Sequence, residues 1–139
     1  MTRHAQCQCG ALCVDAEGEP DAVVVCSCTA CQRRSGSPFG EAAYYGRDKL
    51  TFTGTGREYV RATDAGNTFH TFFCTTCGAS LYFFSSRDPN RLGIAVGAFA
   101  DPQFPPPHRS VYEARKHAWL IFPAELAGFI AGRDSERTR

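Results

Sequence analysis

Apolar and polar residues alternate over short stretches of the chain, which is the pattern of half-buried β-strands. Residues 11–17 show this alternation clearly, because Leu12, Val14 and Ala16 occupy every second position. Glycine, proline, aspartate and asparagine residues, which favour turns, separate such stretches. The strands predicted in this way span residues 11–17, 22–25, 39–45, 49–53, 57–61, 68–73, 80–84, 92–99 and 111–114. Many short strands joined by close turns predict a mainly β fold.

One stretch has helical spacing instead. Residues 123–130 begin with a proline, which favours the first helical position, and Leu126, Phe129 and Ile130 then repeat at helical intervals. We therefore expect one short C-terminal helix. The 139 residues are enough for one domain, and the sequence shows no linker or repeat. We expect a single domain over residues 1–132 and a frayed tail over residues 133–139.

Composition and charge narrow the class of protein. The 15 Lys and Arg residues against 14 Asp and Glu residues leave a net charge of +1, which argues against nucleic acid or an anionic membrane as the main partner. No apolar stretch approaches the roughly 18 residues of a membrane helix, and the N-terminal residues lack the apolar segment of a secretory signal. We expect a cytoplasmic protein that binds neither nucleic acid nor membrane, with its single tryptophan, Trp119, in the core.

Cysteine is the unusual residue of this sequence. Eight cysteines in 139 residues are about 6% of the chain, below the content of a typical disulfide scaffold. In a reducing compartment, clustered thiols hold a metal more often than they form disulfides. Cys13 stands alone and is expected to be a bystander, whereas the others form three clusters: Cys7 and Cys9; Cys26, Cys28 and Cys31; Cys74 and Cys77.

The first and third clusters each end in Cys-Gly. Glycine permits the positive φ of a tight turn, so that backbone N–H groups can point at the thiolates. Four sulfurs complete a tetrahedral zinc shell and leave no vacant position. Cys7, Cys9, Cys74 and Cys77 therefore predict a structural zinc site, with thiols that bind no metal as the alternative.

The middle cluster offers three sulfurs, and no fourth ligand follows it in the sequence. Three protein ligands and one vacant position are the pattern of a catalytic zinc. Two alternatives stay open for Cys26, Cys28 and Cys31. They could form a second closed site with Cys13 or a histidine, or they could be three buried apolar cysteines.

Two arginines and one histidine are further candidates. Arg33 and Arg34 directly follow the middle cluster, where a guanidinium group would offset the negative charge of a zinc–thiolate centre or bind a carboxylate of the ligand. Neighbouring side chains point in different directions, so we expect only one of the two to act; solvated surface arginines are the alternative. His108 follows three prolines and could polarise a substrate, donate a proton or hold a loop through a hydrogen bond.

Three segments together resemble the glutathione-dependent formaldehyde-activating family, which includes centromere protein V. These segments are CQCG, CSCTACQRRSGSPFG and FFCTTCGASLYF. Weaker matches continue through residues 96–102, His108, Trp119 and residues 122–126, so that the resemblance covers nearly the whole chain.

The resemblance implies a fold of several coiled β-sheets joined by a structural zinc, similar to that of methionine sulfoxide reductase B. It implies the activity of a zinc-dependent carbon–sulfur lyase, an S-(hydroxymethyl)glutathione synthase that joins glutathione to formaldehyde and serves formaldehyde detoxification. Two Zn²⁺ ions are implied, a structural one and a catalytic one, with the respective ligands Cys7, Cys9, Cys74 and Cys77, and Cys26, Cys28 and Cys31.

Other functions remain compatible with this cysteine framework. A non-catalytic zinc-binding module would dock a protein or a nucleic acid, and it predicts a closed middle site with a basic or apolar surface patch. Another small thiol or another small aldehyde could replace glutathione or formaldehyde without a change of enzyme class. A methionine sulfoxide reductase is excluded, because that enzyme needs a nucleophilic cysteine downstream and no cysteine follows Cys77.

Overall fold

β-Strands make up most of the regular structure in the computed structural model, which describes all residues from Met1 to Arg139. The mainly β class predicted from the sequence is therefore confirmed. The chain divides into two units, which we call the first and the second unit. The first unit contains residues 1–21 and 43–104, and the second contains residues 22–42 and 105–139.

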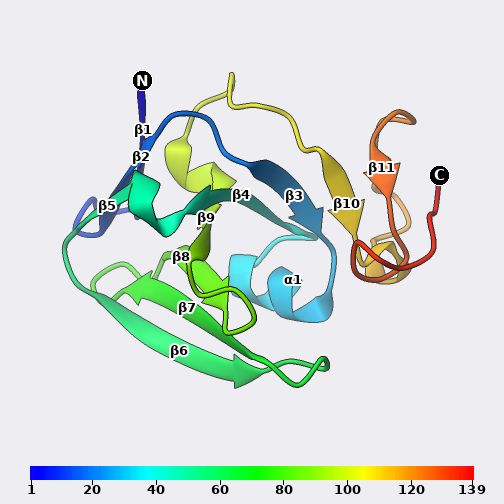
Figure 1. Cartoon of the computed structure of the whole chain (residues 1–139), viewed down its shortest axis with the longest axis horizontal. Helices are drawn as coiled ribbons and strands as arrows, with labels where there is room; N and C mark the ends of the chain where they lie inside the picture. Colours follow the sequence, from blue (N-terminus) through cyan, green and yellow to red (C-terminus); the bar gives the residue numbers. More distant parts are fainter. The chain divides into compact units, whose positions relative to one another are not determined.

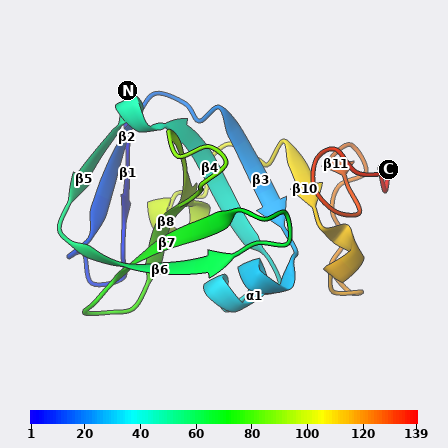
Figure 2. The same cartoon turned by 60° about the horizontal axis from the view of Figure 1, so that its bottom comes forward.

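The first unit contains a three-stranded antiparallel sheet. Strand β2 (Cys13–Glu17) lies between β1 (Thr2–Gln6) and β5 (Leu50–Thr53) (Figure 2). The alternation predicted for β2 is present, because Val14 and Ala16 are fully buried on one face. The hydrophobic pattern of the sequence does not predict β1.

A second set of strands in the first unit forms an antiparallel meander. It runs through β6 (Gly56–Ala62), β7 (Thr68–Cys74), β8 (Ser80–Ser85) and β9 (Arg91–Ala95) (Figure 1). Beyond β9 the backbone changes to a 3-10 helix, η2 (Val96–Phe99). The strand predicted over residues 92–99 is therefore too long, since Gly97 weakens a strand.

Two further elements contribute to the first unit. A 3-10 helix, η1 (Arg47–Lys49), leads into β5. Strand β4 (Gly40–Gly46) is shared, because its residues 40–42 belong to the second unit and residues 43–46 to the first. The core of the first unit contains the fully buried side chains of Tyr45, Phe83, Leu12, Leu81, Leu92, Ile94 and Val14.

The second unit contains three parallel strands, which belong to an eight-stranded sheet, and the helix. Strand β10 (Arg109–Val111) lies between β3 (Ala22–Cys26) and β11 (Ala127–Gly128), and both pairings are parallel. Helix α1 (Thr29–Ser35) follows β3 almost directly (Figure 1), and the 3-10 helix η3 (Glu113–Arg115) follows β10. No helix of the structure is long and apolar enough to cross a membrane.

The predicted C-terminal helix over residues 123–130 is wrong. The chain forms a turn there, in which the Leu126 N–H donates to the Pro123 carbonyl, and then enters β11. Gly128 explains the difference in part, because glycine within a helix costs about 1 kcal/mol relative to alanine. The only α-helix is α1, which the sequence analysis missed, since none of its residues is buried and no apolar periodicity marks it.

The tail over residues 133–139 is hydrogen-bonded in the structure. The Ile130 N–H donates to the Glu136 carbonyl, and the Thr138 N–H donates to the Gly128 carbonyl. The Arg139 guanidinium binds both carboxylate oxygens of Glu113. The tail therefore differs from the frayed segment that its polar sequence predicts, because these contacts tie it to β11 and η3.

Candidate metal centres

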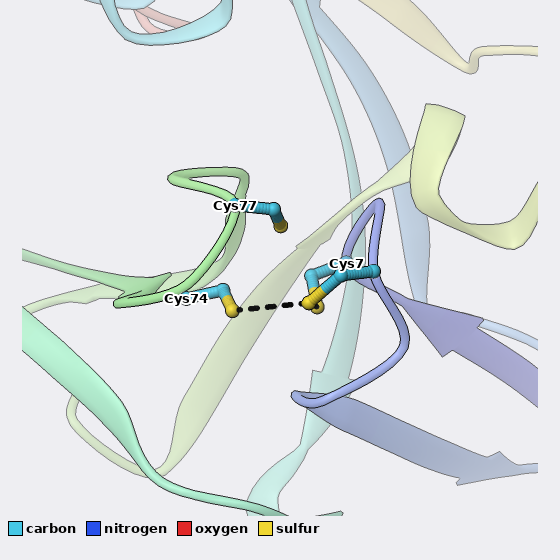
Figure 3. Close-up of side chains that lie close together, drawn as sticks. Cys7, Cys74 and Cys77 are labelled. Carbon is cyan, nitrogen blue, oxygen red and sulfur yellow. Dashed lines mark hydrogen bonds between the residues drawn. The ribbon is translucent and has the colours of Figure 1, made fainter.

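Four cysteine side chains converge in the first unit. Cys7 and Cys9 lie in the turn between β1 and β2, whereas Cys74 ends β7 and Cys77 lies in the turn between β7 and β8. Their Sγ atoms all lie within 4.8 Å of one another. Figure 3 shows Cys74 and Cys77 on one turn and Cys7 on the other, with their sulfurs pointing toward a common centre. The contact joins segments that are 65 residues apart in the chain.

The spacing of these sulfurs fits a zinc ion. A tetrahedron with Zn–S bonds of about 2.3 Å has sulfur–sulfur edges of about 3.8 Å. The Sγ atoms of Cys7 and Cys9 are 3.8 Å apart, and those of Cys9 and Cys74 are 3.7 Å apart. The four residues therefore have both the donor chemistry and the separation that a tetrahedral thiolate site requires.

Backbone N–H groups donate hydrogen bonds to two of these four sulfurs. The Leu12 N–H donates to Cys7 Sγ at 3.2 Å, and the Thr76 N–H donates to Cys74 Sγ at 3.4 Å. Hydrogen bonds from the backbone of Cys77 and Thr76 lower the pKa of the Cys74 thiol to about 6. Gly10 and Gly78 adopt φ values of +82° and +78°, which glycine tolerates without strain.

Three cysteines converge in the second unit, where β3 leads into α1. Cys26 ends β3, Cys28 is the N-cap residue of α1, and Cys31 lies in its first turn. Their Sγ atoms lie within 4.8 Å of one another, all three side chains are half-buried, and the Cys31 N–H donates to Cys28 Sγ at 3.3 Å. We call this group the cysteine trio.

The cysteine trio can hold a thiophilic metal ion. Within the second unit no histidine, carboxylate or further cysteine joins the group. Hydrogen bonds that the Cys26 thiol donates to Cys28 and Cys31, together with burial, raise the pKa of Cys26, so that this thiol keeps its proton in the absence of a cation. A bound cation would replace this proton and favour three thiolates. Cys13 lies in the first unit, where its thiol donates to the Gly10 carbonyl at 3.2 Å.

The two arginines after the trio have different surroundings. Arg33 is exposed, whereas Arg34 is half-buried. A Cβ atom built on Gly40 would lie 2.6 Å from Arg34 Nη2 and 3.3 Å from Cys31 Cβ. The guanidinium group of Arg34 therefore occupies the space beside Cys31 that the absent side chain of Gly40 leaves open. Hydrogen bonding with Cys26 lowers the pKa of Cys31, but hydrogen bonding with Cys28 and burial raise it overall, and the positive charge of Arg34 opposes this rise.

Sequence reasoning missed Gln32 and His117. The Gln32 amide nitrogen donates to the Ser27 carbonyl at 2.8 Å and to the Arg115 carbonyl at 3.1 Å. Its Oε1 lies 3.0 Å from His117 Nε2. The Gln32 side chain thus connects the cysteine-bearing segment to a segment 85 residues away, and no local sequence motif predicts a contact at that separation.

The structure also shows the surroundings of His108 and Trp119. His108 holds the chain beside β3, because the Val23 N–H donates to its Nδ1 at 2.9 Å and its own N–H donates to the Val23 carbonyl at 2.8 Å. Of the roles considered, this contact matches the loop-holding hydrogen bond. Trp119 was expected in the core, and that expectation is wrong, because Trp119 is 69% exposed.

The family follows from a comparison with known protein families. The model of the glutathione-dependent formaldehyde-activating enzyme family matches residues 2–115. The chain belongs to this family. The matched region contains all seven clustered cysteines, and it supports a formaldehyde-activating, glutathione-related function at the level of the family.

Solved structures share the fold of this family member. A crystal structure of a Rhodobacter sphaeroides protein from a structural genomics programme is 23% identical in sequence, with a TM-score of 0.56. The similarity covers 74% of this chain and 91% of the other. No curated protein matches the sequence significantly.

Proposed function

We propose that this protein is a zinc-dependent carbon–sulfur lyase that joins glutathione, or a similar small thiol, to formaldehyde or another small aldehyde. The reaction is an addition in which the thiol sulfur bonds to the carbonyl carbon. The carbonyl oxygen receives the proton that the thiol loses, so that the product with formaldehyde is an S-hydroxymethyl thioether. The reverse reaction breaks the same carbon–sulfur bond.

The cysteine trio supports this proposal most directly. The three Sγ atoms of Cys26, Cys28 and Cys31 lie within 4.8 Å of one another, and the second unit adds no fourth ligand to them. A zinc ion held by three protein thiolates keeps one position for a substrate thiol and favours its thiolate form at neutral pH. The side chains of the trio would thus bring the nucleophilic sulfur to one defined point.

Both arginines would act, in separate roles, whereas the sequence alone predicts a role for only one of them. Three thiolates and Zn²⁺ carry a formal charge of −1, and a substrate thiolate would make it −2. Arg34, beside Cys31, would offset part of this charge. Arg33, on the exposed side of α1, would bind a carboxylate of the thiol.

The four-cysteine cluster would have a separate, structural role. Four sulfurs leave no position for a substrate on a tetrahedral zinc ion. Cys7, Cys9, Cys74 and Cys77 would then hold the turn between β1 and β2 against the turn between β7 and β8. Metal binding of this kind contributes directly to the free energy of folding.

A rate measurement tests the proposed activity. Glutathione and formaldehyde are mixed by stopped flow, and the disappearance of the thiol is followed with and without zinc-loaded protein. We expect the protein to raise the rate above that of the spontaneous addition and Cys28→Ser to abolish this increase. Cys13→Ser is the matched control, because Cys13 belongs to neither cluster, and it should keep the full rate. A zinc-loaded protein that leaves the spontaneous rate unchanged would contradict the proposal and favour the non-catalytic binding module.

A further inference from the structure

The side chain of Gln32 holds the backbone of the cysteine trio. Its amide nitrogen, Nε2, lies 2.8 Å from the Ser27 carbonyl oxygen and 3.1 Å from the Arg115 carbonyl oxygen. Both oxygens accept hydrogen bonds, so the amide nitrogen and not the amide oxygen must face them. The amide oxygen then faces His117 Nε2 at 3.0 Å and accepts a hydrogen bond from it. These three contacts fix the orientation of the Gln32 amide.

Ser27, which lies between two cysteines of the trio, is held at both of its peptide groups. Its N–H donates to the Val111 carbonyl of β10 at 3.1 Å, and its carbonyl accepts the hydrogen bond from Gln32. The Ser27 side chain is fully buried. The peptide group that leaves Cys26 and the peptide group that enters Cys28 are therefore both fixed, which restricts the directions in which these two cysteine side chains can point.

Gln32 also contacts the trio through its own backbone. Its N–H donates to the Cys28 carbonyl at 3.0 Å, which is the first helical hydrogen bond of α1, and the Cys31 N–H donates to Cys28 Sγ. Any residue at position 32 except proline would make the backbone hydrogen bond. The hydrogen bond to the Ser27 carbonyl, in contrast, needs a side chain of this length with an N–H donor.

The far end of this contact is itself fixed. Arg115 ends η3, where its N–H donates to the Tyr112 carbonyl at 3.1 Å, and the N–H of the following Lys116 donates to the Glu113 carbonyl at 3.1 Å. Gln32 therefore connects the trio to a hydrogen-bonded turn. A contact to such a turn can hold the Ser27 carbonyl in place when the nearby sulfurs are charged.

Metal binding at the trio would benefit from this support. The three Sγ atoms lie within 4.8 Å of one another, and thiolates at such distances repel one another until a cation neutralises them. A backbone that is already held loses less conformational freedom when the ion binds. Residues that orient metal ligands without touching the metal contribute about ten- to a hundredfold in metal affinity.

We propose that Gln32 is a positioning residue of the metal site at the cysteine trio. Its side-chain amide holds the Ser27 carbonyl, so that the three sulfurs keep the separation at which they bind one ion. Gln32 acts through the backbone and not as a metal ligand, because its amide oxygen faces His117 and its amide nitrogen faces two carbonyl oxygens. The inference rests on the metal site of the proposed function.

Cobalt binding at the trio tests this role. Protein that retains zinc at the four-cysteine cluster is titrated with Co²⁺, and the sulfur-to-cobalt absorption is followed; Cys28→Ser should remove this absorption and so assign it to the trio. Gln32→Met replaces the amide by an apolar chain of similar length that also favours helix, and we expect it to weaken Co²⁺ binding about tenfold. We also expect a lower d–d absorption per bound ion, because this intensity depends on how closely the ligands approach a tetrahedron.

A merely structural role of Gln32 gives a different result. Gln32→Met would then lower the melting temperature but leave the Co²⁺ affinity and the d–d absorption unchanged, and that outcome would overturn the inference. Gln103→Met makes the same change at an exposed glutamine of the first unit, and this matched control should bind Co²⁺ within a factor of two of the unaltered protein.

A second variant covers the case in which Gln32→Met does not fold. His117→Ala removes only the hydrogen bond to the Gln32 amide oxygen, and it does so at an exposed position. We expect it to weaken Co²⁺ binding about threefold, because the amide is then free to rotate away from the Ser27 carbonyl. An unchanged affinity of this variant would overturn the inference in that case.

The cobalt titration separates this inference from the proposed activity, because it requires no turnover. A Co²⁺ affinity that depends on Gln32, in a protein that does not accelerate the addition of glutathione to formaldehyde, would contradict the proposed function and leave Gln32 as a positioning residue. A protein that accelerates the addition and binds Co²⁺ equally well with and without Gln32 would overturn this inference alone. The absence of any Co²⁺ absorption that depends on Cys28 would contradict both proposals.

Discussion

Gly40 determines which of the two arginines lies beside the cysteine trio. Gly40 is buried at the start of β4, and any side chain there would meet the Arg34 guanidinium at 2.6 Å and Cys31 Cβ at 3.3 Å. The φ angle of Gly40 is not in the left-handed region, so glycine is needed here for space rather than for backbone freedom. A single absent side chain thus allows Arg34 to approach Cys31, while Arg33 stays exposed.

This geometry predicts a measurable effect on metal affinity. Loss of a positive charge beside a negatively charged thiolate site destabilises the metal-bound form, so Arg34→Gln should weaken binding at the trio about tenfold. Gly40→Ala should also weaken metal binding at the trio, since the added methyl group displaces the Arg34 guanidinium. Titration with Co²⁺, followed by the sulfur-to-cobalt charge-transfer absorption, measures this affinity. Arg33→Gln should leave the Co²⁺ affinity within a factor of two, and an equal loss for both arginine variants would contradict the prediction.

At the level of elements, the sequence predicts what local patterns encode. Alternation identifies most strands, because one buried face imposes a period of two, as Val14 and Ala16 illustrate. Cysteine spacing identifies both candidate metal clusters, since the members of each pair or trio lie close together in the sequence. Helix α1 lacks such a signal, because it is fixed by its Cys28 cap and not by an apolar face. The apparent helical period at 123–130 is overridden by pairing of β11 with β10.

The contacts that complete the candidate site have no local signature. Gln32 and His117 are 85 residues apart, and either residue alone is an ordinary polar surface residue. The choice between Arg33 and Arg34 depends on Gly40, which comes from a different element. Trp119 looks like a core residue by its chemistry, and only the fold reveals its exposure. These features depend on tertiary packing and could not be predicted from sequence.

An ion pair between Arg139 and Glu113 joins the C-terminal tail to η3. The Glu113 side chain is only 4% exposed, and its Oε1 lies 2.7 Å from Arg139 Nη1 and 3.0 Å from Thr138 Oγ1. Burial alone would raise the pKa of Glu113, but the hydrogen bonds from Arg139 and its neighbours lower it below the usual 4.5. A lowered pKa in the folded state means that the carboxylate stabilises the fold above about pH 4.5. This contribution is lost as pH falls through the folded-state value.

Arg139→Gln should therefore destabilise the protein in a pH-dependent way. At pH 7 the variant leaves the Glu113 carboxylate buried without its cation, and we expect a loss of about 2 kcal/mol in the free energy of unfolding. The difference from the unaltered protein should shrink as pH falls below 4.5 and disappear below the folded-state pKa of Glu113, because Glu113 is then protonated in both proteins. Urea unfolding of both proteins at a series of pH values measures this difference in the free energy of unfolding. A difference that stays constant from pH 7 to pH 3 would show that the ion pair is not its cause.

For the whole molecule, the important feature is that each unit contains one complete cysteine cluster. The four-cysteine cluster joins segments of the first unit that are 65 residues apart, and closing so long a loop restricts the unfolded chain considerably. The trio spans only residues 26–31, within one strand end and one helix start. A metal ion at the four-cysteine cluster would therefore stabilise the fold of the first unit, whereas a metal ion at the trio would fix only the local geometry between β3 and α1.

A serine variant of each cluster should consequently differ in how far it destabilises the strands of the first unit. Cys74→Ser removes one ligand of the long-range cluster, and we expect loss of zinc from that site, a melting temperature at least 10 °C lower and rapid amide exchange in β1, β2, β7 and β8. Cys28→Ser should lower the zinc content by one ion per chain but keep these strands protected, because their metal site is intact. Zinc analysis and amide hydrogen exchange distinguish the two, with Cys13→Ser as the control that keeps both ions. Similar unfolding in both variants would mean that the trio is structural as well, and the separation of roles between the two units would then be wrong.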